Sequence, residues 1–208
     1  MVIAEGGIGK VNGAITATAL VERFGCRLLV FTGVAGGLDP ELAVGDVVIA
    51  EKTIQYDTGV AGKYGLERYQ PGHVPFFNPT DRFGYEPSPP LLAAVRRRLD
   101  GFTLPPLSSR AGGIGQPPHI VFATVLTGDQ FVNSEVTRLR LRSELKGAAV
   151  EMEGAALAQT AEALGVDHLV IRSLSDLAGA GSIRDFATFL DEVAANSVRV
   201  VRHLLAAL

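Results

Sequence analysis

The chain has 208 residues, of which 47% are hydrophobic and 20% are charged, and its formal net charge is −3 at pH 7. These values are typical of a globular protein with one well-buried core, and the length is short for two domains. The longest basic run, residues 96–98, lies on a predicted helix and is interpreted as a solvated face, which argues against a nucleic-acid partner.

The sequence contains no pattern typical of a membrane span, a signal peptide or a metal site. Cys26 is the only cysteine, which excludes an internal disulfide and a zinc ribbon. No run approaches the roughly 18 apolar residues of a membrane span, and residues 1–10 lack the basic start and apolar core of a signal peptide. The histidines are scattered: His73, His119, His168 and His203. We therefore expect a cytoplasmic protein without a metal site.

Short apolar runs alternate with amphipathic runs, which predicts an α/β protein made of one domain, residues 1–208. Apolar runs that end in glycine or polar residues are interpreted as strands, and apolar residues at three- and four-residue spacing as helices. In chain order these patterns predict helix 10–24, strands 27–33 and 44–54, helix 89–99, strand 119–129, helix 134–145, strand 147–153, helix 153–165, strand 168–176 and a last helix over about 185–207.

The same spacing predicts which side chains of the first and last helices face inward. The predicted inner face of the first helix consists of Ala14, Ala17, Val21 and Phe24. That of the last helix consists of Phe186, Phe189, Leu190, Val193, Ser197, Val201, Leu204 and Leu208.

Two segments are predicted to be irregular. Residues 68–90 contain six prolines, three phenylalanines and two tyrosines. This is too aromatic for an idle linker, so we expect the segment either to pack on a partner or to cover a pocket. Residues 104–118 are rich in Pro, Gly and Ser and are interpreted as a flexible loop.

Four predicted strands end in short polar or glycine-containing segments: TGVAGGLDP, LTGDQF, EMEGAA and RSLSDLA. Ligands of α/β sheets bind beyond the carboxyl ends of the strands, so these segments together predict a site. The glycines of GGIGK (6–10) and TGVAGG (32–37) fit either tight turns or a close approach to a ligand. GGIGK lacks the spacing of a Walker phosphate loop.

Asp176 is the strongest candidate for a catalytic residue. It follows an apolar strand, with Ser173 and Ser175 available to donate hydrogen bonds and Arg172 as a counter-charge. A partly buried carboxylate in such surroundings has a tunable proton affinity, as general acid catalysis requires. The alternative is an aspartate that caps a helix or forms a turn.

Glu151 and Glu153 bracket Met152 where a predicted strand passes into a helix. Charge at this position is costly unless it is paired. One of the two acids can serve the first turn of the helix, but capping needs one acid at most. We therefore expect the pair to have a further role, with Met152 lining a pocket.

Five motifs resemble those of the nucleoside phosphorylase/nucleosidase superfamily and occur in its order: GGIGKVNGA, TGVAGGLDPELAVGDVVIA, LTGDQFVNS, VEMEGAALAQ and RSLSDLA. The chain most resembles the 5′-methylthioadenosine/S-adenosylhomocysteine nucleosidase family, from about residue 4 to the C-terminus and least over 62–118. The resemblance implies a nucleoside phosphorylase-like fold, with a mixed, barrel-like central sheet flanked by helices, and release of adenine from adenosine-type nucleosides.

The resemblance also implies the residues that carry the chemistry. Asp176 resembles the general acid that protonates the leaving adenine at ring nitrogen seven, and Ser175 resembles the residue that steadies it. Glu153 resembles the carboxylate that accepts hydrogen bonds from the 2′- and 3′-hydroxyls of ribose. Met152 resembles the residue packed against the sugar.

Further residues resemble those that surround the base and the 5′ substituent. Phe131 resembles the aromatic that stacks on the base, and the backbone of Val132 the group that recognises the purine. Ile8 and Phe186 resemble the apolar contacts near the base and the 5′-thio group. Arg172 is similar to an arginine that supports the site from beneath. The resemblance implies no metal or organic cofactor.

Phe31 favours water over phosphate as the attacking group. Phosphorylases that resemble this chain carry an arginine at that place, and an aromatic ring cannot hold a phosphate. We expect a dissociative reaction, in which an oxocarbenium-like ribosyl cation forms as adenine leaves and water attacks the anomeric carbon.

The chain departs from the family pattern at its start and at residue 34. The family's first strand carries a glutamate that activates water, whereas MVIAEGGIGK corresponds to a later point, where Glu5 is the nearest spare carboxylate. Without that strand, we expect unpaired sheet edges that residues 68–90 or a second subunit cover. Val34 stands where the nucleosidases more often have serine.

The resemblance implies a homodimer, because members of the family are homodimers whose partner closes the 5′ pocket. Residues 60–64 and 68–90 are the candidates for this contact. Two alternatives stay open: another purine-nucleoside cleaver on the same fold (a futalosine hydrolase or a phosphate-dependent phosphorylase), and a catalytically impaired paralogue that binds nucleosides.

Overall fold

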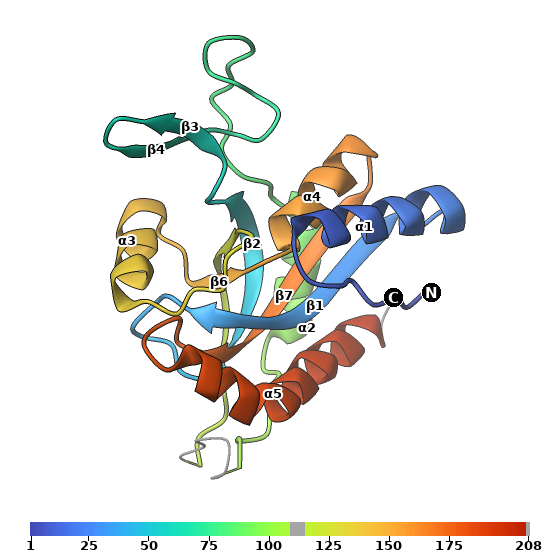
Figure 1. Ribbon diagram of the computed structural model, residues 1–208. Coiled ribbons are helices and arrows are strands. Elements are labelled where there is room, and N and C mark those ends of the chain that lie inside the picture. The colour runs from blue at the N-terminus through green and yellow to red at the C-terminus, as the bar shows by residue number, and fades with distance from the viewer. Residues whose placement is uncertain (109–114, 207–208) are drawn as a thin grey trace.

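Five strands close into a barrel at the centre of the protein, as the computed structural model shows (Figure 1). The structure describes residues 1–108 and 115–206, so Leu208, the end of predicted helix 185–207 and part of predicted loop 104–118 lie outside the described residues. The α/β class and the mixed, barrel-like sheet are confirmed. The strand order is β1-β6-β5-β2-β7, with β1 Leu28–Gly37, β2 Val47–Gln55, β5 Ile120–Thr127, β6 Ala149–Glu151 and β7 Asp167–Asp176.

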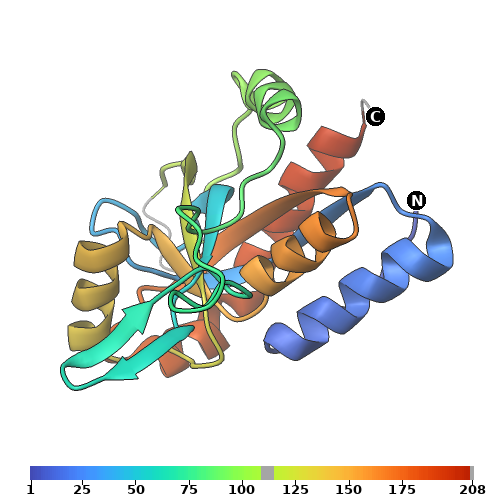
Figure 2. The ribbon, with the colours of Figure 1, turned by 90° about the horizontal axis from the view of Figure 1, so that it is seen from above.

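The helices pack around this barrel: α1 Lys10–Phe24, α2 Pro89–Leu99, α3 Glu135–Leu145, α4 Gly154–Ala163 and α5 Ser182–Leu205. α1 and α4 lie side by side in both views (Figure 1 and Figure 2). In Figure 1, α5 lies on the other side of the barrel from them. The predicted bounds of α1 and α2 are the observed ones. No helix of the described part of the chain is long and apolar enough to cross a membrane.

Local signals set several helix ends. Ser88 caps α2 by accepting a hydrogen bond from the Leu91 amide, and Pro89 opens the helix, where its missing N–H costs nothing. Ser134 caps α3 in the same way. α1 ends at Gly25, whose φ of 64° is a left-handed conformation that suits glycine.

β1 closes the barrel because it pairs with different strands along its length. From Leu28 to Ala35 it runs parallel to β7, and beyond a register shift Gly36 and Gly37 pair antiparallel with β6. β2 is parallel to β5 and antiparallel to β7. The expectation of unpaired edges in the central sheet is therefore wrong for the five barrel strands, since a closed ring has no edge strand.

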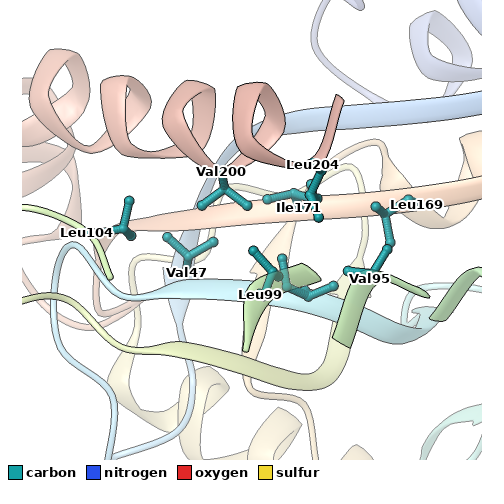
Figure 3. Close-up of a cluster of buried hydrophobic side chains, with 9 residues drawn as sticks. Val47, Val95, Leu99, Leu104, Leu169, Ile171, Val200 and Leu204 are labelled. Carbon is teal, nitrogen blue, oxygen red and sulfur yellow. The ribbon is translucent and has the colours of Figure 1, made fainter. Parts of the chain in front are cut away.

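A hydrophobic core joins α2 and α5 to the barrel. Figure 3 shows Val200 and Leu204 of α5 beside Ile171 of β7, with Val95 and Leu99 of α2 on the other side. Burial of each such side chain contributes about 1.5–3 kcal/mol. These contacts hold β7, whose C-terminal end carries the predicted general acid.

The predicted inner faces of the two helices are confirmed except at one position, apart from Leu208, which lies outside the described residues. Val193, Ser197 and Leu204 of α5 are buried, as is Ala17 of α1. Phe24, by contrast, is 60% exposed. This part of the prediction is wrong because the buried cluster beneath α1 ends at Leu20 and Val21, before the last residues of the helix.

Small residues allow α4 to lie close to both the barrel and α1. The buried residues of α4 are Gly154, Ala155, Ala156, Leu157, Ala158 and Ala161. Gly13 of α1 approaches the start of α4 so closely that an added Cβ would lie 3.2 Å from the Cβ of Glu153. The packing therefore brings the N-terminal turn of α1 to a predicted site residue.

A hairpin of β3 Gly59–Gly62 and β4 Gly65–Arg68 was missed in the sequence, because its strands are short and lack a clear apolar alternation. It projects from the barrel together with the segment that follows (Figure 1). Within this segment Tyr85 is buried and bridges to Thr53, whereas Phe76 and Phe77 are 84% and 83% exposed.

His168, near the start of β7, is a buried histidine. Among the residues that the structure describes, its Nε2 atom has no hydrogen-bond partner. Burial lowers the pKa of the imidazole below its usual range, although Asp167 and Glu162 oppose the shift. The folded protein therefore favours the neutral ring.

Acidification should destabilise the protein through His168. The unfolded chain binds a proton near the usual histidine pKa of about 6.5, whereas the folded chain binds it only at lower pH. The contribution of the neutral ring is thus present above about pH 6.5 and is lost as the pH falls toward the folded pKa. Urea unfolding should show a weaker pH dependence for His168→Leu than for the wild type. Equal slopes for His168→Leu and wild type would contradict the prediction.

Candidate active site

A cavity of about 280 Å³ opens at the C-terminal ends of β1, β6 and β7. Its lining residues are Ile8, Val34, Ala35, Gly36, Gln130, Phe131, Val132, Val150, Glu151, Met152, Glu153, Ser175, Asp176 and Phe186. The structure therefore brings together all the predicted site residues except Arg172, which lies beneath the cavity. A larger hollow of about 710 Å³ beside α2 is more open and contains none of them.

Residues 68–90 do not line this cavity. The expectation that this segment covers a pocket is therefore wrong for the cavity that holds the site residues. The reason is its position: it leaves the barrel with the projecting hairpin instead of folding back over the strand ends (Figure 1).

Glu151 is bound on all sides by the protein. The Gly154 amide donates to its Oε2 at 2.8 Å, and the Glu153 amide donates to the same atom at 3.1 Å. The Thr127 hydroxyl and the Arg172 guanidinium also donate to it. Glu151 is thus the acid that serves the first turn of α4, and its lone pairs are occupied by protein donors.

Glu153 has a different environment, although it is only two residues further along. Its Oε1 accepts a hydrogen bond of 2.6 Å from the Gly9 amide, and its Oε2 lies 3.4 Å from Nη2 of Arg172. It makes no side-chain cap to α4. A carboxylate accepts about four hydrogen bonds, so Glu153 retains acceptor capacity toward the cavity.

Burial raises the pKa of Glu153 above its usual range. The Gly9 hydrogen bond opposes this shift, the nearby charge of Glu151 adds to it, and Arg172 opposes it. The charged form of Glu153 therefore depends on its two donors, Gly9 and Arg172.

Arg172 connects the two glutamates from below. Its side chain is 2% exposed, and its guanidinium lies 4.2 Å over the Phe31 ring. An added Cβ at Gly33 would overlap this guanidinium, so glycine in the TGVAGG motif makes room for it. Phe31 itself lies outside the cavity lining, as does the exposed Glu5.

Asp176 lies at the end of β7 and is 2% exposed. The Ser175 hydroxyl donates to its Oδ2 at 3.0 Å, and the Ala178 amide donates to its Oδ1 at 2.8 Å. The contact with the Ala178 amide is the kind expected of an aspartate that forms a turn, which was the alternative to a catalytic role. Asp176 nevertheless also lines the cavity. It does not cap α5, whose N-cap is Gly181.

Apolar side chains form the mouth of the cavity. Phe131 and Phe186 meet edge to face with ring centroids 5.9 Å apart, and Ile8 stands exposed beside them at 74%. The faces of such rings suit stacking with a flat aromatic ligand such as a purine. In the part of the chain that the structure describes, no three His, Cys, Asp or Glu side chains are grouped to hold a metal ion.

The sequence interpretation missed Gly9, Thr127, Ala35 and Gln130. Thr127 and Gly9 act through a hydroxyl or a backbone amide on a distant glutamate, and such contacts leave no local pattern. Gln130 could have been found from its place in the LTGDQF segment.

Comparison with known proteins places this geometry in a family. The model of the phosphorylase superfamily matches residues 1–206. A Mycobacterium tuberculosis protein named 5′-methylthioadenosine/S-adenosylhomocysteine nucleosidase is 56% identical over 99% of this chain and 80% of its own length. The aminodeoxyfutalosine nucleosidase of Campylobacter jejuni is 32% identical over 96% of this chain and 76% of its own length.

A solved structure has the same fold. It is the Helicobacter pylori 5′-methylthioadenosine/S-adenosylhomocysteine nucleosidase in complex with a pyrrolo-pyrimidine pyrrolidine compound, with a TM-score of 0.82 and 28% identity. The match covers 99% of this chain and 79% of that one.

Thr127→Val should destabilise the protein, because the hydroxyl both donates to Glu151 and accepts from the Ala155 amide at 2.8 Å. Two buried partners would lose their hydrogen bond, which should lower the free energy of unfolding by about 1–3 kcal/mol. Thr127→Ser keeps the hydroxyl and should lose much less. Urea denaturation of both variants measures the difference, and equal losses would count against the hydrogen bonds as the cause.

Proposed function

The chain belongs to the phosphorylase superfamily and, within it, to the 5′-methylthioadenosine/S-adenosylhomocysteine nucleosidases, and we propose that it hydrolyses the N-glycosidic bond of these two nucleosides and releases adenine. One observation carries the proposal: Asp176 and Glu153 line the same cavity from opposite sides of the end of β1. A carboxyl group that can protonate the adenine and a carboxylate that can accept hydrogen bonds from the ribose thus lie at the same end of the barrel.

Asp176 is proposed as the general acid. Its proton passes to ring nitrogen seven of adenine while the bond between the base and the anomeric carbon breaks. Near-complete burial and the Ser175 hydroxyl hold the carboxyl group in one orientation. Water then adds to the ribosyl cation and completes the hydrolysis.

Glu153 is proposed to bind the ribose diol, because its remaining lone pairs face the cavity and two hydroxyls can satisfy one carboxylate. Met152 packs on the sugar, and Arg172 supports the carboxylate from beneath. Phe131, Phe186 and Ile8 surround the base and the 5′ substituent, and the Val132 backbone recognises the purine.

The lining of the cavity supports water as the attacking group. Among its described residues none is Lys, Arg or His, and Arg172 below it is engaged by Glu151 and Glu153. Phosphate would lack a cationic partner there. A second candidate substrate is aminodeoxyfutalosine, because the relative from C. jejuni is named aminodeoxyfutalosine nucleosidase.

We further propose a cytoplasmic homodimer that acts in methionine salvage, with residues 1–208 as one domain. The exposed aromatic side chains of Tyr64, Phe76 and Phe77 on the projecting hairpin and the segment after it support a contact there with a second copy. The scarcity of cysteine supports a reducing compartment.

Adenine release from 5′-methylthioadenosine, S-adenosylhomocysteine and aminodeoxyfutalosine tests the proposal. Release should not depend on added phosphate. Asp176→Asn keeps the shape but removes the proton donor, so kcat should fall by about 10²–10⁴-fold while the fold is retained. A loss of less than about tenfold would remove Asp176 from the role of acid, and phosphate dependence would indicate a phosphorylase.

Glu153→Gln should weaken binding of ribonucleosides far more than binding of free adenine. The amide offers one acceptor oxygen where the carboxylate offers two, and hydrogen bonds to a charged group contribute about 1.5–3 kcal/mol. Calorimetric titration with a non-hydrolysable C-nucleoside analogue of adenosine and with adenine measures both. A similar loss for the two ligands would contradict the sugar role.

A further inference from the structure

Three charged residues form a closed cluster beside the cavity without lining it. The Lys10 ammonium lies 2.7 Å from Oδ1 of Asp57, and the Lys10 backbone amide donates to Oδ1 of Asp129 at 2.8 Å. The Asp129 amide in turn donates to Oδ2 of Asp57 at 2.9 Å. The cluster joins the start of α1 to the segments that follow β2 and β5.

This cluster caps α1 from outside the helix. The N-cap residue Gly9 offers no side chain, so the first amides of α1 need acceptors from elsewhere. Asp129 accepts the Lys10 amide, and Glu153 accepts the Gly9 amide at 2.6 Å. Negative carboxylates at a helix N-terminus are favourable.

The cap couples the cluster to the site. Gly9 directly precedes Lys10, and Ile8, which lines the cavity, directly precedes Gly9. Any shift of Lys10 away from Asp57 and Asp129 therefore moves the amide that binds Glu153.

We propose that Lys10, Asp57 and Asp129 are positioning residues for the reaction: they hold the Gly9 amide on Glu153, so that this carboxylate presents its remaining lone pairs to the ribose diol. The inference rests on the proposed function of Glu153 and adds the residues that orient it. None of the three needs to touch the substrate.

The surrounding charges explain why Glu153 needs this support. Glu151 on β6, Arg172 on β7 and Asp129 from the segment after β5 lie near it, and Asp176 on β7 lines the same cavity. Burial raises its pKa, with Glu151 and Asp129 adding to the effect, and the Gly9 hydrogen bond is the foremost opposing cause. Lys10 also holds a positive charge 3.8 Å from Oδ2 of Asp129.

Loss of the Gly9 contact should raise this pKa further. Glu153 would then be protonated at a higher pH than in the wild type. The acid limb of the binding profile, which is the pH range over which nucleoside affinity falls on acidification, should therefore move to higher pH. A cluster that merely stabilises α1 would lower the melting temperature without moving this limb.

Lys10→Met, Lys10→Arg and the control Lys52→Met test the inference. Lys52 also forms an ion pair, with Glu86 at 3.5 Å, but lies outside the cavity lining. The probes are a C-nucleoside analogue of adenosine, whose carbon–carbon glycosidic bond resists hydrolysis, and adenine, both titrated calorimetrically over a range of pH.

For Lys10→Met, the Kd of the C-nucleoside should rise about tenfold at neutral pH, and its acid limb should move up by about one pH unit, the shift that matches a tenfold change. The Kd of adenine should change by less than about twofold, because salt screens the effect of a distant charge on adenine binding. Lys10→Arg keeps the charge beside both aspartates and should recover most of the affinity, and Lys52→Met should match the wild type.

An unchanged acid limb, or an equal loss of adenine and C-nucleoside, would overturn the inference. If Lys10→Met does not fold, Asp57→Asn provides the same test. The two carboxylate oxygens of Asp57 accept hydrogen bonds from the Lys10 ammonium and the Asp129 amide, and the substitution removes one of these oxygens. Adenine release from 5′-methylthioadenosine by the wild type distinguishes a failure of the proposed function from a failure of the positioning role. A wild type that binds the C-nucleoside but releases no adenine refutes the proposed function, while the binding data still decide the positioning role. Failure of the wild type to bind either probe overturns both.

Discussion

The buried ion pair between Arg172 and Glu151 is the interaction on which the ligand end of the barrel depends. Both side chains are 2% exposed, and they tie β7 to the end of β6, just before α4. Removing one partner of such a pair leaves an uncompensated charge, at a cost of about 3–5 kcal/mol. The surroundings provide for both charges: Gly33 leaves space for the guanidinium, and Thr127 and two backbone amides satisfy the carboxylate.

That arrangement leaves Glu153 available for a ligand. Because Glu151 already serves the first turn of α4, the second acid has no structural duty there and turns toward the cavity. One backbone amide from the opposite end of the chain and a shared arginine favour its charged form. Two acids of one short motif thus have different donors: the protein satisfies Glu151, whereas Glu153 keeps the acceptor capacity that its proposed role requires.

Close packing of small residues allows the Gly9 amide to reach Glu153. The alanines of α4 and Gly13 of α1 allow the two helices to approach, which places the GGIGK turn over Glu153. Barrel closure has a comparable effect on Asp176, since Gly36 of β1 pairs with both β6 and β7 and admits the Asp176 carboxylate beside it. Glycine is required at these positions because a side chain would occupy the space of a functional group.

Apolar periodicity by itself determined the helices 10–24 and 89–99, the approximate positions of the five barrel strands and the segments whose ends form the cavity, because these depend on residues that are neighbours in the chain. The motifs also indicated Asp176 and Glu153. Only the tertiary structure decided which glutamate caps α4, how β1 closes the barrel, and that Lys10 and Gly9 reach the site. The physical reason is separation: the Gly9–Glu153 hydrogen bond spans 144 residues, and no local pattern records a partner that folding alone brings near.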